Sequence, residues 1–170
     1  MVSGAVHPDV VLLTGLFAGL GVECSPAVSE PDNAEYGAAV SDLGQSTIRF
    51  RVGKLTPTKV GLFVSVWRRG AGGSTEPFPA EDDMDALVVV AREGDRFGAF
   101  VFPNEVLATR GVVSVCGAGG KRGFRVYPPW SATSSPQAKR SQGWQCDWFL
   151  DLSDGAAVDL QRAGCLFAAV

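Results

Sequence analysis

The chain has 170 residues, of which 46% are hydrophobic and 19% are charged, and its formal net charge is −3 at pH 7. This length suits one domain with a core of ordinary size, and the composition excludes a disordered chain. A small negative net charge excludes nucleic acid as a partner only if the charges are evenly spread, because binding depends on where they lie.

The first part of the chain combines one clear helix with strands. Apolar residues at helical spacing and a proline in the first turn predict a helix over residues 8–21. Residues 23–33 are polar and predict a loop, and 34–40 a short helical turn. Alternating apolar and basic residues over 48–52 predict a strand with one solvent-exposed face. The β-branched and aromatic run over 60–67 predicts a central strand.

The second part begins with a glycine-rich loop over 68–79 and contains a predicted hairpin. The remaining elements follow from apolar runs and proline positions: hairpin strands 87–91 and 97–102, a brief helix over 103–107, strands at 112–115 and 124–127, and a final helix over 136–150. We therefore expect one α+β domain spanning 1–170, with a central mixed sheet flanked by helices.

The apolar run over 10–17 does not predict a membrane segment or a signal peptide. It is too short to cross a bilayer as a helix, and Asp9 precedes it instead of basic residues. The four cysteines form no CxxC pair and His7 is the sole histidine, so a zinc site lacks ligands. We expect a cytoplasmic protein with reduced cysteines, no membrane contact and no cofactor.

The basic residues are segregated from the acidic ones. The first basic window, residues 43–75, has no carboxylate, and neither has the second basic window, residues 106–146. Together they hold twelve of the fifteen lysines and arginines: Arg49, Arg51, Lys54, Lys59, Arg68, Arg69, Arg110, Lys121, Arg122, Arg125, Lys139 and Arg140. If the windows meet in space, they predict a surface that binds phosphates; otherwise they are two solvated faces.

Catalytic motifs are weak. The contiguous acids at 81–83 are typical of a solvated loop, and no lysine has an acid two residues before it, so the acid-x-lysine pair of metal-dependent nucleases is absent. The glycine-rich segment 117–123 lacks the hydroxyl residue and following helix of a P-loop and predicts a turn. We therefore favour binding over catalysis.

Three blocks resemble a known family. Residues 54–64 (KLTPTKVGLFV) with 67–69 (WRR), residues 98–103 (GAFVFP) and residues 120–130 (GKRGFRVYPPW) are similar, in order, to the motifs of the MepB family. Residues 137–138 (QA) and 142–145 (QGWQ) continue the match, and the resemblance is strongest over 35–150. It implies a bacterial, typically cytoplasmic protein, and one family member is encoded beside a multidrug efflux pump and its repressor.

The resemblance also implies a fold similar to the restriction-endonuclease-like, PD-(D/E)xK core. That likeness suggests a protein that binds DNA or RNA without a complete nuclease site. Lys54 would take the place of the nuclease lysine, with Val52 where its acid should be. The binding residues that the matched blocks imply are Lys54, Lys59, Arg68, Lys121, Arg122, Arg125, Tyr127, Trp130 and Trp144.

Two alternatives remain open. One is a metal-dependent nuclease with a rearranged site, in which Glu35 and Asp85 hold Mg²⁺. The other is a small-ligand or protein-binding module linked to drug efflux, with Trp67, Tyr127 and Trp130 lining an apolar pocket.

Overall fold

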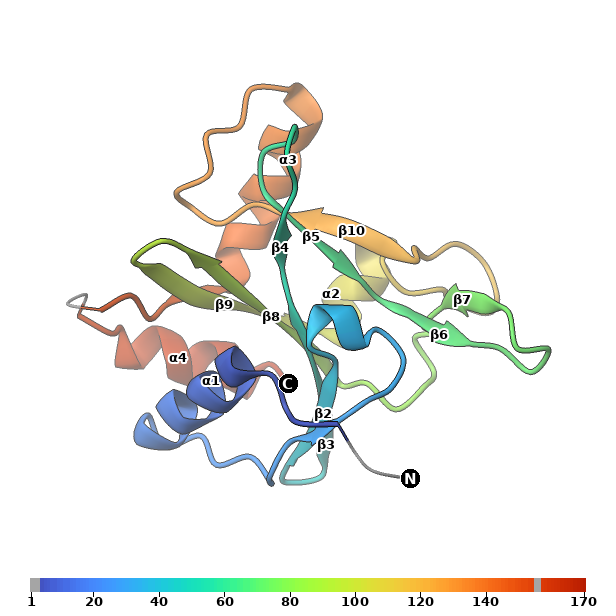
Figure 1. Cartoon of the computed structure of the whole chain (residues 1–170), viewed down its shortest axis with the longest axis horizontal. Coiled ribbons are helices and arrows are strands. Elements are labelled where there is room, and N and C mark those ends of the chain that lie inside the picture. The colour runs from blue at the N-terminus through green and yellow to red at the C-terminus, as the bar shows by residue number, and fades with distance from the viewer. Residues whose placement is uncertain (1–3, 155–156) are drawn as a thin grey trace.

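The computed structural model describes residues 4–154 and 157–170 and has an α+β fold built on a mixed six-stranded sheet (Figure 1). The sheet order is β1 (Val28–Ser29), β2 (Ala39–Leu43), β3 (Ser46–Val52), β8 (Ala86–Glu93), β9 (Arg96–Pro103) and β11 (Phe149–Asp151). β3 and β8 pair in parallel, and all other neighbours pair antiparallel. The predicted α+β class and the hairpin, now β8–β9, are confirmed.

Two helices cover one face of this main sheet. They are α1 (Pro8–Gly19) and α4 (Leu160–Ala168), and their rings of Phe17 and Phe167 meet edge to face at 4.7 Å. Period-two alternation directs Ile48, Phe50 and Val52 of β3 into the same cluster, so α1 and α4 share one core with β3 and β8. Arg92 of β8 also binds Asp9 of α1 at 2.8 Å, which ties this helix to the main sheet.

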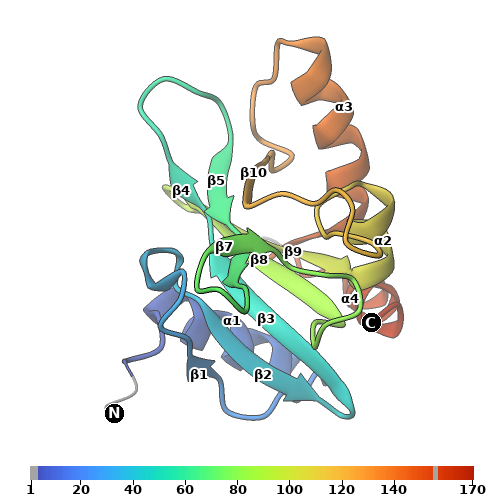
Figure 2. The same ribbon diagram turned by 90° about the vertical axis from the view of Figure 1, so that its right-hand side faces the viewer.

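A second, smaller sheet covers the other face. Its order is β10 (Gly123–Val126), β5 (Leu62–Ser65) and β4 (Lys54–Leu55), all antiparallel. Leu62 and Val64 of β5 pack in one buried cluster with Phe100 and Phe102 of β9. Figure 2 shows this sheet lying across β8 and β9, with the β4–β5 loop and a further helix, α3 (Pro136–Gln145), rising on either side of β10.

The chain continues from β5 into a two-stranded ribbon of β6 (Trp67–Arg69) and β7 (Thr75–Pro77). The run over 60–67 therefore does not form one central strand. It breaks after Ser65, and β5 lies in the middle of the small sheet instead. The β6–β7 ribbon carries the predicted glycine-rich loop at its tip.

Three other expectations were wrong. Residues 112–115 make only isolated bridges, Pro79 with Ser114 and Val115 with Ala118. The predicted helix over 136–150 ends at Gln145, passes through the 3-10 turn η2 (Cys146–Trp148) and joins the main sheet as β11. It is not the last helix, since α4 follows it. The short elements at 34–40 and 103–107 appear as the 3-10 turn η1 (Ala34–Tyr36) and helix α2 (Asn104–Thr109).

The face of β3 that was expected to meet solvent is also covered. Arg51 is only 1% exposed, because the small sheet lies over it. Its Nε donates a hydrogen bond to the backbone carbonyl of Ser65 in that sheet. Within the two described ranges, every helix falls short of the length and apolar character that crossing a membrane requires.

Candidate functional site

An open pocket of about 600 Å³ lies between the β4–β5 loop, strand β10 and the first turns of α3. Four basic side chains line it, and we call it the basic pocket: Lys59, Arg110, Lys121 and Arg125. Lys59 comes from the first basic window and the other three from the second. The fold thus brings part of each window to one concavity.

The four cations of the basic pocket are not paired with any carboxylate that the structure describes. None of them forms an ion pair in the part of the chain that the structure describes, and no described carboxylate lines the pocket. Lys59, Arg110 and Lys121 are exposed, and Arg125 is half-buried. Positive charge left uncompensated in a hollow attracts anions more strongly than the same charge on a convex surface.

Arg125 is held in place by the loop opposite. Its Nη1 donates to the carbonyl of Val60 at 3.2 Å, its Nη2 donates to Oγ1 of Thr56, and its guanidinium lies 5.9 Å from the ring centre of Phe63. These neutral acceptors orient the guanidinium and leave its charge unpaired.

Lys54 lies on the same face of the small sheet as Arg125 but outside the basic pocket. Both residues pair across the strands with Phe63, so all three side chains point to one side. The Nζ of Lys54 is 4.6 Å from the ring centre of Tyr36, a cation–π contact. Val52, where a nuclease acid would stand, is buried in the core beneath α1.

Helix α3 supplies the other wall. Ser135 caps its N-terminus by accepting the N–H of Ala138 at 3.1 Å. The ring of Trp144 lies between Phe102, at 5.4 Å, and the guanidinium of Arg110, at 5.2 Å. Trp144 therefore supports Arg110 at the pocket wall, and its ring is already in contact with two side chains of the protein.

The four arginines of the first basic window lie away from the basic pocket, around a separate cavity of about 210 Å³. We call them with their carboxylates the arginine–carboxylate cluster: Arg49, Arg51, Arg68 and Arg69 with Glu30, Asp32, Glu76 and Asp82. Every arginine there has an acidic partner within 4.0 Å. The predicted binding residue Arg68 thus sits apart from the basic pocket, with its charge compensated.

Arg51 is the buried member of that cluster. Burial lowers the pKa of Arg51 to about 10, and the nearby carboxylate of Glu30, 3.7 Å away, opposes the shift. The guanidinium therefore stays ionised at neutral pH and depends on Glu30 as its counter-charge.

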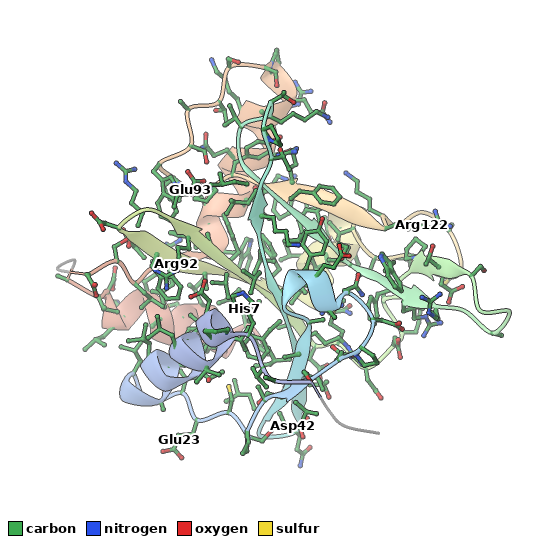
Figure 3. The ribbon with its side chains drawn as sticks, viewed as in Figure 1. His7, Glu23, Asp42, Arg92, Glu93 and Arg122 are labelled. Atoms are coloured by element: carbon green, nitrogen blue, oxygen red, sulfur yellow. The ribbon has the colours of Figure 1, made fainter. Side chains whose placement is uncertain are left out.

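The remaining predicted residues are dispersed. Tyr127 and Trp144 line the basic pocket. Arg122 points instead to the β6–β7 ribbon, where it donates to the carbonyl of Thr75 at 3.0 Å (Figure 3). Trp130 packs edge-on against Phe149 at 5.4 Å.

The three aromatics proposed for a small-ligand module do not share a cavity. Tyr127 lines the basic pocket, Trp67 lines the cavity of the arginine–carboxylate cluster, and Trp130 lines neither.

The metal candidates Glu35 and Asp85 are not brought together. Asp85 lies near the start of β3, where its carboxylate accepts the N–H of Thr47 at 2.7 Å. Glu35 lies near the other end of β3, because the next residue, Tyr36, contacts Lys54 just beyond that end. The two contacts therefore lie at opposite ends of β3, a strand of seven residues that is about 20 Å long. No group of three or more potential metal ligands occurs among residues 4–154 and 157–170.

Two residues of the site were not among the binding residues predicted from the matched blocks. Arg110 lies in the second basic window but outside the matched blocks, so the window itself was the signal that would have found it. Gln145, which is 1% exposed, lies in the matched segment 142–145, but only Trp144 of that segment was selected as a binding residue.

Comparison with known proteins places these features in a family. A family model described as MepB-like matches residues 30–151. The chain belongs to the MepB-like family. The solved structure "Crystal Structure of MepB" is 31% identical, with a TM-score of 0.75, over 86% of this chain and 97% of that chain. No curated protein matches the chain.

The MepB-like match includes all four cations of the basic pocket and excludes α1 and α4, which lie before and after it. The family match and the similar solved structure confirm the resemblance that the sequence blocks indicated.

Proposed function

We propose that this MepB-like protein binds nucleic acid, DNA or RNA, by contacting phosphates at the basic pocket. The observation that carries the proposal is that Lys59, Arg110, Lys121 and Arg125 line one hollow in which no carboxylate of the described residues takes part. Lysine and arginine that neutralise phosphates release condensed counterions, and this release supplies most sequence-independent affinity.

The arginine–carboxylate cluster supports the same assignment by contrast. Its arginines have internal partners, so an incoming phosphate would have to displace a carboxylate there. At the basic pocket a phosphate displaces only water and counterions. A nucleic acid therefore gains more at the basic pocket.

We further propose that the main sheet corresponds to a restriction-endonuclease-like core that has lost its nuclease chemistry. The parallel pair β3–β8 with antiparallel neighbours is compatible with such a core. The separation of Glu35 from Asp85 and the buried Val52 beside Lys54 support a binding role, because metal-dependent hydrolysis needs two or more carboxylates close together.

A salt titration tests the proposal. Affinity for single-stranded DNA, duplex DNA and RNA is measured between low and physiological salt. We expect log K to fall linearly with log salt concentration, with a slope of about −0.7 per phosphate contact for single strands and about −0.9 for duplex DNA.

Two charge reversals locate the contact. Lys121→Glu should weaken binding and flatten the salt slope. Lys139→Glu makes the same charge change at an exposed residue of α3 that does not line the pocket, and should have a much smaller effect. Absence of binding to all three nucleic acids at low salt, or equal effects of the two variants, would refute the proposal.

A further inference from the structure

The size of the basic pocket limits which part of a nucleic acid can enter it. Its volume of about 600 Å³ lies within the about 300–1,000 Å³ of sites that take one small molecule. A sphere of that volume is about 10 Å across, less than the about 12 Å width of the major groove of B-DNA alone. The pocket is therefore of a size that suits one unpaired nucleotide better than an intact duplex.

The charge of the basic pocket limits the ligand further. An internal phosphodiester brings one negative charge, whereas a phosphomonoester at a strand end brings about −1.5 to −2 at pH 7. Four cations without a lining carboxylate exceed what one phosphodiester can neutralise. A terminal phosphate compensates more of this charge in the same volume.

The cations approach from different walls, as a tetrahedral phosphate needs. Lys59 stands on the β4–β5 loop, Arg125 on β10, Lys121 just before β10 and Arg110 just after α2. Arg110 is backed by the ring of Trp144. A guanidinium that contacts an indole on one side keeps its N–H donors available for a ligand on the other.

The first turn of α3 provides neutral donors at the same wall. Ser134, Ser135 and Gln137 line the pocket there. The Oγ of Ser135 accepts the N–H of Ala138, which leaves its own hydroxyl hydrogen free to donate. The positive end of the ten-residue helix adds to the potential that the four cations create.

From these observations we propose that the basic pocket recognises the phosphorylated end of a nucleic-acid strand, holding the terminal nucleotide by its phosphomonoester. The inference rests on the proposed function, since it names the part of the nucleic acid that the same pocket selects. It predicts that affinity depends on the chemistry of the strand end and not only on the number of phosphates.

The test compares one short single-stranded sequence, labelled internally, in four forms: with a 5′-phosphate, with a 3′-phosphate, with hydroxyls at both ends, and circularised. At constant salt, we expect one of the two phosphorylated forms to bind about tenfold or more tightly than the dihydroxyl form, as charge-assisted hydrogen bonds allow. The circle should bind no better than the dihydroxyl form. Which end is preferred identifies the polarity of recognition.

A matched pair of double variants shows whether the pocket causes the preference. Lys59→Ala with Lys121→Ala should abolish the advantage of the phosphorylated end. Lys139→Ala with Arg140→Ala removes the same net charge from exposed positions outside the pocket and should preserve it. All four residues are exposed, so neither variant should disturb the core.

Each negative result has its own meaning. If all four forms bind equally, the end-recognition inference fails while the proposed nucleic-acid binding stands. If the advantage of the phosphate survives Lys59→Ala with Lys121→Ala, the pocket is not the site of recognition and the inference fails as well. If no form binds at low salt, the proposed function itself fails.

Discussion

Gln145 joins the end of helix α3 to the backbone of Arg125. Its Nε2 donates to the carbonyl of Arg125 at 2.9 Å, and its Oε1 accepts the N–H of Tyr127 at 2.8 Å. β10 is an edge strand of the small sheet, so the amide replaces the strand that would otherwise satisfy these groups. One buried side chain thus fixes the two walls of the basic pocket relative to each other.

Replacing Gln145 should therefore cost stability. In Gln145→Leu, which preserves volume, the carbonyl of Arg125 and the N–H of Tyr127 lose their partners in a buried place. We expect a loss of about 3 kcal/mol in the free energy of unfolding, measured by urea denaturation. Gln137→Leu, at an exposed position of the same helix, is the control and should change it by less than about 0.5 kcal/mol.

Local patterns predicted the elements whose contacts are local. The helix over 8–21 and the hairpin of β8 and β9 follow from spacing and turn chemistry within short segments. Residues 149 and 150 were expected to end a helix, but they belong to β11, which pairs with β9 about fifty residues earlier in the chain. Such long-range strand pairing outweighs local periodicity, and it cannot be detected from a short window of sequence.

The candidate site was predictable only in part, for a similar reason. Counting charges along the chain correctly showed two basic windows, and Lys59 does meet Lys121 and Arg125. The same count could not show that Glu30 and Asp82, outside the first window, fold back onto Arg49 and Arg68. Ion pairing across the fold divides a continuous basic stretch of sequence into one compensated and one uncompensated surface.

Glu30 is the counter-charge on which buried Arg51 depends. Glu30→Gln would leave an ionised guanidinium that is 1% exposed without its carboxylate. Because Glu30 itself is partly exposed, we expect a loss of about 2 kcal/mol, below the about 3–5 kcal/mol of fully buried pairs. Asp32→Asn, which removes the exposed partner of Arg69, should cost at most about 1 kcal/mol. Equal losses in the two variants would contradict the special role of Glu30.

Gly61 permits the close approach of the β4–β5 loop to β10. Its φ is +84°, and a Cβ there would lie 2.7 Å from both the carbonyl oxygen of Val126 and the ring of Tyr127. Gly61→Ala should therefore cost about 3 kcal/mol or more and weaken nucleic-acid binding, because the loop carrying Lys59 must move.

Gly44 provides the control for backbone strain alone. Its φ is +61°, but a Cβ there meets nothing within 4 Å. Gly44→Ala should cost about 1 kcal/mol and leave binding unchanged. Similar losses in the two alanine variants would mean that the contact of Gly61 with β10 contributes little to the pocket.

Trp144 should report occupancy of the basic pocket. Its indole is 5.2 Å from the guanidinium of Arg110, and a phosphate that binds Arg110 changes the charge next to the ring. We expect the tryptophan fluorescence to change on titration with a phosphorylated single strand, and Trp144→Phe to remove most of that change while retaining binding. Trp67→Phe should keep it, since Trp67 lies in the cavity of the arginine–carboxylate cluster. A change that is lost in Trp67→Phe and kept in Trp144→Phe would place the nucleic acid at that cluster instead.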